Sequence, residues 1–299
     1  MECINVSILA REAKKVKLWR TRIAVKLILS RLPLNYRRWA KLGLFRHGAM
    51  DEYLYAWEVL KSHASELNNT DDWKGLELGP GDGLLSSFLS PALGSSGITL
   101  VDAGDFANKD VSFYRQHIKD FLVSFPDLVL PDFSNKSNIE SMLLAVNGSY
   151  HTKGLLSLKS LKDSSYDLIY SQAVLEHVRR HEFEETMKEC YRLLSPNGVM
   201  SHVVDFKDHL GGGLNNMRFP STLWELDWFA SESGFYTNRM RLSEMILLCE
   251  DIGFSVKVCN TKRWTSFPIK RTQLAREFYD LSDDDLLISG AHLVMKLKY

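Results

Sequence analysis

Three glycines at alternating positions, Gly79, Gly81 and Gly83, lie between an apolar run of strand length and a helical stretch at residues 84–89. Glycine lets the backbone turn sharply and approach a ligand without a Cβ clash. The first turn of the helix has N–H groups without partners inside the helix, and these favour an anionic part of a ligand. The spacing therefore predicts a ligand-binding loop rather than only a tight turn.

The third glycine separates two classes of cofactor. A dinucleotide-binding loop has the pattern Gly-x-Gly-x-x-Gly/Ala, which here requires a small residue at position 84. That position is Leu84, whose side chain obstructs the close helix–strand approach of a pyrophosphate site. A dinucleotide oxidoreductase is therefore the disfavoured alternative.

An aspartate, Asp102, ends the next apolar run and lies nineteen residues after Gly83. A carboxylate at the tip of a second strand, about 20 residues past a glycine loop, accepts two hydrogen bonds from a ribose diol. Aspartate is also common at strand ends, so a purely structural Asp102 is the alternative. Its position after the glycine loop favours ribose binding.

Titratable side chains follow two later apolar runs. Residues 165–178 (SYDLIYSQAVLEHV) end with a Glu-His pair, and Asp205 and His209 come soon after residues 199–204. Histidine titrates near neutral pH, and a base at a strand's carboxyl end is placed to accept a substrate's proton. His209, Asp205 and His177 are therefore the candidate catalytic residues. A loop anchored by the Glu-His pair and a solvated loop at His209 are the structural alternatives, and no metal site is predicted there.

A segment rich in aromatic and basic side chains follows the second of these groups. Three consecutive glycines at 211–213 make its beginning pliable, as a lid over a substrate requires. Aromatic faces and guanidinium forks suit a flat or sugar-like acceptor that carries phosphate or carboxylate. We therefore expect a lid over about residues 206–240, with a simple packing layer on the sheet as the alternative. Its candidate acceptor-binding residues are Trp224, Tyr236, Asn238 and Arg239.

These residues need a scaffold that brings strand ends together. Beyond residue 70, apolar runs rich in Val, Ile and Leu alternate with helical segments such as residues 181–194. Strand-length runs separated by helices predict an open, doubly wound α/β domain with a parallel sheet. Ligands bind such domains beyond the carboxyl ends of the strands. The predicted strands are residues 75–78, 98–101, 166–170, 199–204, 254–258 and 292–297.

Several of these motifs resemble a known family. Residues 77–83 (ELGPGDG) are similar to the first motif of class I S-adenosylmethionine-dependent methyltransferases, an acidic residue followed by Gly-x-Gly-x-Gly. Asp102 matches the family's second motif, and residues 165–178 follow its pattern (Phe/Tyr)-Asp-x-Ile-x-x-x-x-Val-Leu-Glu-His-Val. The resemblance covers roughly residues 70–299 and, weakly, 32–63. It implies a Rossmann-like, mostly parallel seven-stranded sheet with an antiparallel last strand, and S-adenosyl-L-methionine (SAM) as cofactor.

The resemblance also implies roles for single residues. The glycine loop wraps the amino-acid end of the cofactor, and Glu77 organises the loop and the ligand's ammonium group. Family members often have Asp or Asn where this chain has Ser171, and an acidic residue that contacts adenine, which residues 150–155 lack. The adenine is therefore expected against backbone and apolar atoms near Leu155. The expected cofactor-binding residues are Glu77, Gly79, Pro80, Gly81, Gly83, Asp102, Leu155, Ser171 and Gln172.

The 299-residue chain has no net charge, with 37 basic and 37 acidic residues, but its charge is segregated. Residues 1–50 hold twelve Lys/Arg and two Asp/Glu, a net +10, so residues 51–299 carry −10. A helix is predicted over residues 8–31, with basic side chains on one face and apolar ones such as Trp19 and Ile23 on another. This helix either packs on the acidic body, within the chain or across a dimer, or lies on an anionic membrane surface. Nucleic acid is disfavoured because the body has no basic run interleaved with aromatics.

The four cysteines, Cys3, Cys190, Cys249 and Cys259, form no Cys-x-x-Cys pair. Their spacing predicts neither a zinc cage nor a disulfide framework and favours reduced thiols. No window approaches the roughly 18 uncharged apolar residues of a membrane-spanning helix, and charges interrupt the N-terminal apolar residues. We therefore expect a cytoplasmic protein, with peripheral contact at the inner face of a membrane as the open alternative.

These features predict a basic helical extension at residues 1–66 and a methyltransferase domain at residues 67–299, with inserted helices at about 103–148. The expected activity is transfer of the SAM methyl group to an oxygen or nitrogen of a small-molecule or glycan-type acceptor, without a metal. The alternatives are a catalytically silent cofactor-binding scaffold and a membrane-associated assembly protein. Whether the chain forms a homo-oligomer is left open by the sequence.

Overall fold

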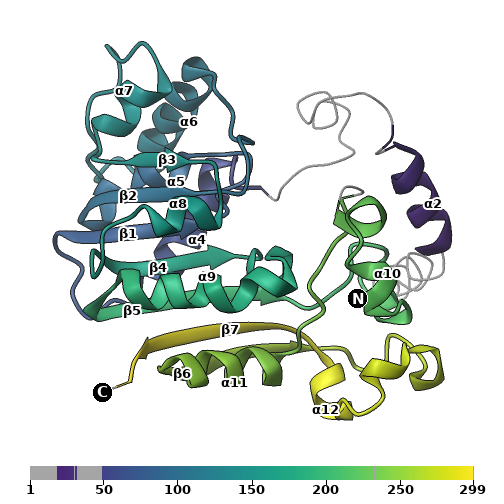
Figure 1. Ribbon diagram of the computed structural model, residues 1–299. Helices are drawn as coiled ribbons and strands as arrows, with labels where there is room; N and C mark the ends of the chain where they lie inside the picture. Colours follow the sequence, from purple (N-terminus) through teal and green to yellow (C-terminus); the bar gives the residue numbers. More distant parts are fainter. Residues whose placement is uncertain (1–18, 30, 32–48, 232–233, 299) are drawn as a thin grey trace, which may run out of the picture.

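The computed structural model describes residues 19–29, 31, 49–231 and 234–298. It contains a seven-stranded sheet in the order β3-β2-β1-β4-β5-β7-β6, in which β7 runs antiparallel to both of its neighbours (Figure 1). This confirms the predicted mostly parallel sheet with an antiparallel last strand. The strands are β1 (Trp73–Leu78), β2 (Ser95–Val101), β3 (Ser149–His151), β4 (Tyr166–Gln172), β5 (Leu194–Asp205), β6 (Phe254–Arg263) and β7 (Ile288–Leu297).

Helices cover both faces of the sheet (Figure 1). Because both faces are covered, the central strands are apolar on both sides, and this is why they are recognisable as continuous apolar runs. The doubly wound arrangement is therefore confirmed. The helices on one face are α4 (Tyr53–Ala64), α5 (Leu85–Leu89), α6 (Val111–Ser124) and α7 (Ile139–Leu144). Those on the other face are α8 (Leu155–Lys159), α9 (Arg180–Leu193) and α11 (Leu242–Ile252).

Two hydrophobic clusters form the core, one on each face of the sheet. On the α9 face Phe183, Met187 and Cys190 are buried at spacings of four and three residues, which is the period of one helix face. Burying one side chain of the size of Phe or Met contributes about 1.5–3 kcal/mol. On the other face α4 contributes Trp57 and Leu60. α4 thus packs in the main core, although its residues fall within the range predicted as N-terminal extension.

The described part of the predicted basic helix is α2 (Trp19–Leu29), which lies beside α10 (Ser221–Trp224) beyond the carboxyl ends of β4 and β5 (Figure 1). Arg22 and Lys26 donate hydrogen bonds of 3.3 and 2.9 Å to backbone carbonyls of the segment predicted as a lid, residues 206–240, which is called the lid here for its position in the sequence. The structure therefore shows packing within the chain for these residues, while the predicted helix before residue 19 lies outside the described residues. The apolar contact, here called the α2–lid cluster, consists of Ile23, Leu210, Trp224, Phe229, Phe235 and Tyr236.

Short helical turns complete the fold. η2 (Leu175–His177) follows β4, whereas η3 (Asn215–Arg218) and η4 (Asp227–Ser231) lie in the lid with α10. No described helix is both long and apolar enough to cross a bilayer. The other short elements are η1 (Ser90–Leu93), η5 (Arg271–Gln273), η6 (Arg276–Phe278) and α12 (Asp283–Leu286).

Candidate functional site

The glycine loop after β1 has the backbone conformation that its sequence predicts. Gly79 and Gly81 have φ values of +66° and +65°, in the left-handed region that favours glycine. A Cβ at Gly79 would lie 2.6 Å from the side chain of Val174, so the loop packs directly on the segment that follows β4. A Cβ at Gly83 would lie 2.3 Å from the carbonyl oxygen of Met50, so the chain before α4 lies against the loop.

Glu77, at the end of β1, is buried beneath this loop. One of its carboxylate oxygens accepts hydrogen bonds from the hydroxyls of Ser86, on α5, and Tyr170, on β4. Burial raises the pKa of Glu77 to about 7, and the two hydroxyl groups oppose that shift. Glu77 therefore links the following helix α5 to the neighbouring strand β4.

Asp102, at the end of β2, lies against the same loop. Its carboxylate accepts hydrogen bonds from the backbone N–H groups of Gly81, at 3.0 Å, and Ala103, at 2.7 Å. Its carbonyl oxygen accepts a 2.8 Å hydrogen bond from the N–H of Gly154, the residue before Leu155 and α8. The structure thus brings Asp102, the glycine loop and the predicted adenine segment together. Burial raises the pKa of Asp102 to about 6, which the backbone donors partly offset.

The end of β4 turns sharply away from the sheet. Ala173 has φ +55°, a left-handed conformation that is uncommon for a residue with a Cβ and that clusters at functional sites. Successive strand residues face opposite sides of a sheet, and accordingly Ser171 bonds His202 Nδ1 at 2.7 Å while Gln172 bonds His63 Nε2 at 3.3 Å. These two predicted cofactor-binding side chains therefore have protein partners on β5 and α4.

The predicted catalytic residues gather beyond β4 and β5. The imidazole rings of His177 and His209 are 4.7 Å apart between centroids, and His177 Nδ1 lies 3.0 Å from the carbonyl oxygen of Tyr236. Asp205, at the end of β5, accepts a hydrogen bond from the Lys207 N–H. All three candidates thus lie where two parallel strands end, as the strand positions predict.

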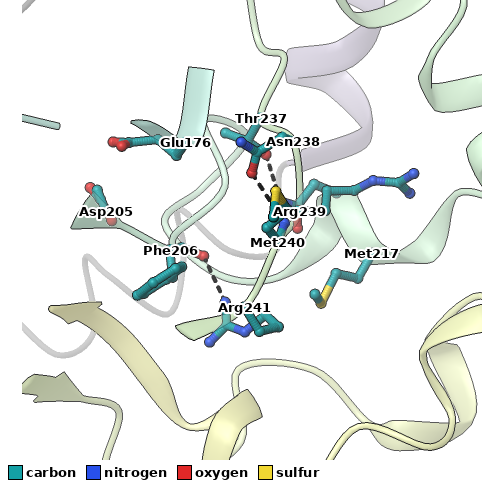
Figure 2. Close-up of a pocket in the computed structure, with 10 residues that line it drawn as sticks. Glu176, Asp205, Phe206, Met217, Thr237, Asn238, Arg239, Met240 and Arg241 are labelled. Atoms are coloured by element: carbon teal, nitrogen blue, oxygen red, sulfur yellow. Dashed lines mark hydrogen bonds between the residues drawn. The ribbon is translucent and has the colours of Figure 1, made fainter. Parts of the chain in front are cut away.

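A small cavity lies between these strand ends and the lid, with about 210 Å³ of empty space including its mouth. Figure 2 shows the carboxyl groups of Glu176 and Asp205 on the same side of it. The lid side is formed by residues 237–241, among them Arg239, whose φ of +60° is again left-handed for a residue with a Cβ. The cavity is therefore bounded by one carboxyl pair and by a constrained strap of the lid.

Glu176, the first residue of the Glu-His pair, lines the cavity, although only His177 of that pair is among the predicted catalytic residues. It is 3% exposed, and neither of its carboxylate oxygens has a hydrogen-bonding partner among the described residues. The backbone of Glu176 and of Asp205 near the carboxylate partly opposes the rise in its pKa. Burial, reinforced by the negative charge of Asp205, raises the pKa of Glu176 to about 8. The group is therefore mostly protonated at neutral pH.

The predicted acceptor-binding residues divide into two sets. Trp224 and Tyr236 belong to the α2–lid cluster and do not line the cavity; Trp224 Nε1 donates to the Thr237 carbonyl at 2.8 Å. Asn238 and Arg239 do line the cavity. Their polar groups also support the lid, because Asn238 Nδ2 donates to two carbonyls of the segment after β4 and Arg239 donates to carbonyl and hydroxyl oxygens near α10.

Asp208 is a structural residue of the lid. Its buried carboxylate accepts hydrogen bonds from the backbone N–H groups of Leu210, Gly212 and Asn215. These contacts hold the turn that starts the lid. The glycine-rich start of the lid is therefore anchored at one point and not pliable throughout.

Comparison with known proteins defines the family. A family model described as a methyltransferase domain matches residues 40–257, which is most of the chain. Phosphoethanolamine N-methyltransferase 2 from Haemonchus contortus, solved with SAM, is 11% identical over 81% of this chain and 53% of its own, with a TM-score of 0.45. The YcgJ protein from Bacillus subtilis is 12% identical over 81% of this chain and 99% of its own, also with a TM-score of 0.45. No curated protein matches the chain at a significant level.

This chain belongs to the methyltransferase domain family, whose members use SAM as methyl donor. The predicted class I family and cofactor are thereby confirmed, and the chain spans about half the length of the Haemonchus enzyme. The residues present fit the cofactor, because two left-handed glycines bring the backbone of the loop against the Asp102 carboxylate. The loop suits the amino-acid end of SAM and the carboxylate suits its ribose.

Proposed function

We propose that the chain transfers the methyl group of SAM to an oxygen or nitrogen atom of a small-molecule or glycan-type acceptor. The observation that carries this proposal is the contact of Gly79 with Val174, which lies two residues before Glu176 and the cavity. A donor at the glycine loop and an acceptor in the cavity are then neighbours. Such an arrangement favours transfer by proximity and orientation.

The residues around the cavity supply the remaining chemistry. When bound, SAM provides an electrophilic methyl group on a positively charged sulfur. The acceptor's proton must leave as the new bond forms, and His209 and Asp205 are proposed to take it, with His177 positioning the His209 ring. Protonated Glu176 and Asn238 are proposed to hold polar groups of the acceptor.

This proposal assigns fewer residues to acceptor binding than the sequence prediction does. Asn238 and Arg239 are proposed to contact the acceptor because they line the cavity. Trp224 and Tyr236 are proposed to shape the lid from within, since their rings pack against α2 and other lid aromatics.

Thermal shift with S-adenosylhomocysteine beside NAD tests the cofactor site. At a hundredfold excess over Kd, binding adds about 2.7 kcal/mol, which raises Tm by roughly 5–10 °C for a domain of this size. We expect this shift with S-adenosylhomocysteine and none with NAD. Asp102→Asn should weaken the shift, because its side chain can no longer accept from the Gly81 and Ala103 N–H groups and from a ribose diol at once.

The matched control is Asp105→Asn, which changes a half-exposed carboxylate of the same loop that pairs with Lys109. Its S-adenosylhomocysteine shift should equal that of the wild type. A larger shift with NAD, or an unchanged shift in Asp102→Asn, would refute the assigned cofactor site.

Peripheral contact with an anionic membrane is a second proposal, and it rests on the outward side of α2. Val25 and Ile28 are 47% and 66% exposed there, and α2 contains no acidic residue. Exposed apolar side chains on a basic helix suit the interface of an anionic bilayer. The half-exposed Trp228 in the lid belongs to the same end of the molecule, since its carbonyl accepts a hydrogen bond from Arg31.

Vesicle flotation tests this contact. The full chain should float with vesicles that contain phosphatidylserine and remain below with phosphatidylcholine vesicles. Val25→Asp combined with Ile28→Asp should abolish flotation. The control combines Val123→Asp with Val129→Asp, two exposed apolar positions at the α6 side of the sheet, and should float as the wild type does. Equal flotation of both variants would rule out α2 as the contact.

A further inference from the structure

Three potential metal ligands from distant parts of the sequence lie close together where the end of α4 meets β6 and β7. Glu66 follows α4, Cys259 lies on β6 and His292 lies on β7. One ligand atom of each residue lies within 4.8 Å of those of the other two. We propose that these three side chains form a binding site for a zinc-class divalent metal ion, with a fourth position open to water.

A β-bulge places the cysteine in this group. Val258 pairs with Leu293 and Asn260 pairs with His292, so Cys259 is an extra residue without a partner in the ladder. Bulges bend a strand and re-aim a side chain. Here the bulged residue carries the thiol, and His292, the partner of the next residue Asn260, carries the imidazole.

The donor set selects the class of metal. Thiolate, imidazole and carboxylate together suit Zn²⁺, whereas Mg²⁺ and Ca²⁺ prefer oxygen ligands alone. Zinc ligands about 2.0–2.3 Å from the ion lie roughly 3.3–3.8 Å from each other at tetrahedral angles. The observed separations, at most 4.8 Å, therefore need only small side-chain rotations, which Cys259 can make because it is exposed.

A hydrogen-bonded chain contacts Nε2 of His292, so Nδ1 is the nitrogen proposed to bind the metal. The Ser201 hydroxyl lies 2.8 Å from His292 Nε2 and 2.7 Å from His63 Nδ1. His63 Nε2 lies 3.3 Å from Gln172 Oε1, whose amide nitrogen in turn points to the Tyr55 hydroxyl at 3.5 Å.

The direction of each hydrogen bond follows from these contacts. Gln172 Oε1 only accepts, so His63 donates from Nε2, and the Nδ1 of a neutral His63 ring accepts. The Ser201 hydroxyl therefore donates to His63 and accepts from His292 Nε2–H. Neutral His292 then has an unprotonated Nδ1, which is the form that binds a metal ion. A histidine that binds a metal ion usually donates a hydrogen bond from its other ring nitrogen in this way.

Cobalt binding tests the site, because Co²⁺ takes the same ligands and a thiolate ligand gives it a charge-transfer absorption band. The wild-type chain should bind one Co²⁺ with this band, and Zn²⁺ should displace it, since zinc binds such sites more tightly. Cys259→Ser should abolish the band. Glu66→Gln should weaken Co²⁺ binding tenfold or more, whereas Glu58→Gln, an exposed carboxylate earlier on α4, should leave it unchanged.

The supporting role of Ser201 has its own measurement. Ser201→Ala should keep the charge-transfer band but weaken metal binding by roughly 10–100-fold, as loss of a partner of a metal-binding histidine does. A band that persists in Cys259→Ser, or no cobalt uptake by the wild type, would overturn the proposal. The S-adenosylhomocysteine shift of the Cys259→Ser and Glu66→Gln variants should equal that of the wild type, so a failure here is distinct from a failure of the proposed methyl transfer.

Discussion

Glu176 is a carboxyl group that burial holds in its neutral form beside a second carboxyl group. An ionised carboxylate without partners is costly in a protein interior, so such a group retains its proton instead. Its neighbour Asp205 is partly exposed and forms a salt bridge with Lys207. Two carboxyl groups with different environments are therefore suited to different roles at one cavity.

The raised pKa of Glu176 predicts a pH dependence of stability. In the folded protein Glu176 keeps its proton up to about pH 8, whereas in the unfolded chain it loses it near the ordinary pKa of 4.5. Folding therefore takes up a proton between these values, and the free energy of unfolding falls as the pH rises. Glu176→Gln has no carboxyl group that must stay protonated at this position. The free energy of unfolding of this variant, relative to that of the wild type, should therefore rise between pH 5 and pH 8 by up to a few kcal/mol.

Urea unfolding at the two pH values measures this difference. Glu184→Gln, an exposed carboxylate on α9 that pairs with Lys188, is the control and should show no change with pH relative to the wild type. A stability difference for Glu176→Gln that is the same at pH 5 and pH 8 would contradict the protonated, buried carboxyl group.

Single residues differ in how far their roles were predictable. The left-handed glycines and Asp102 follow from local spacing, because a strand, a turn and a helix position them within a few residues. Glu176 and Trp224 do not, because their burial depends on what packs over them. An exposed loop and a closed lid would carry the same local sequence.

At the scale of elements, α2 and the lid share one apolar cluster. Ile23→Asp places a charge in that cluster and should destabilise it by a few kcal/mol. We expect faster amide hydrogen exchange in residues 210–229, measured by mass spectrometry, with unchanged exchange in the glycine loop. Ala24→Asp, at an exposed position of the same helix, should leave exchange in the lid as in the wild type.

Uniform acceleration across the whole chain in Ile23→Asp would argue against a separate α2–lid unit. So would unchanged exchange in residues 210–229. The apolar face with Trp19 and Ile23 was predictable from helical periodicity. Its partner was not, because a membrane, a second copy and the lid all satisfy an apolar helix face equally well.

At the scale of the whole molecule, the sheet was predictable because its strands are buried on both faces and alternate with helices. The position of α4 was not. Its apolar face fits an extension as well as a core, and only packing on the sheet against α5 and α6 decides between them. The group of Glu66, Cys259 and His292 could not be predicted from the sequence either. Its members lie far apart in sequence and are brought together by the strand order and a bulge.

Because α2 and the lid share a cluster, the two proposed binding events would be thermodynamically linked. A surface that binds α2 in its packed position would raise the fraction of molecules whose lid is closed. By reciprocity, an acceptor that closes the lid would raise the affinity of that surface for α2 by the same factor. Under these proposals α2 would be an effector site for acceptor binding.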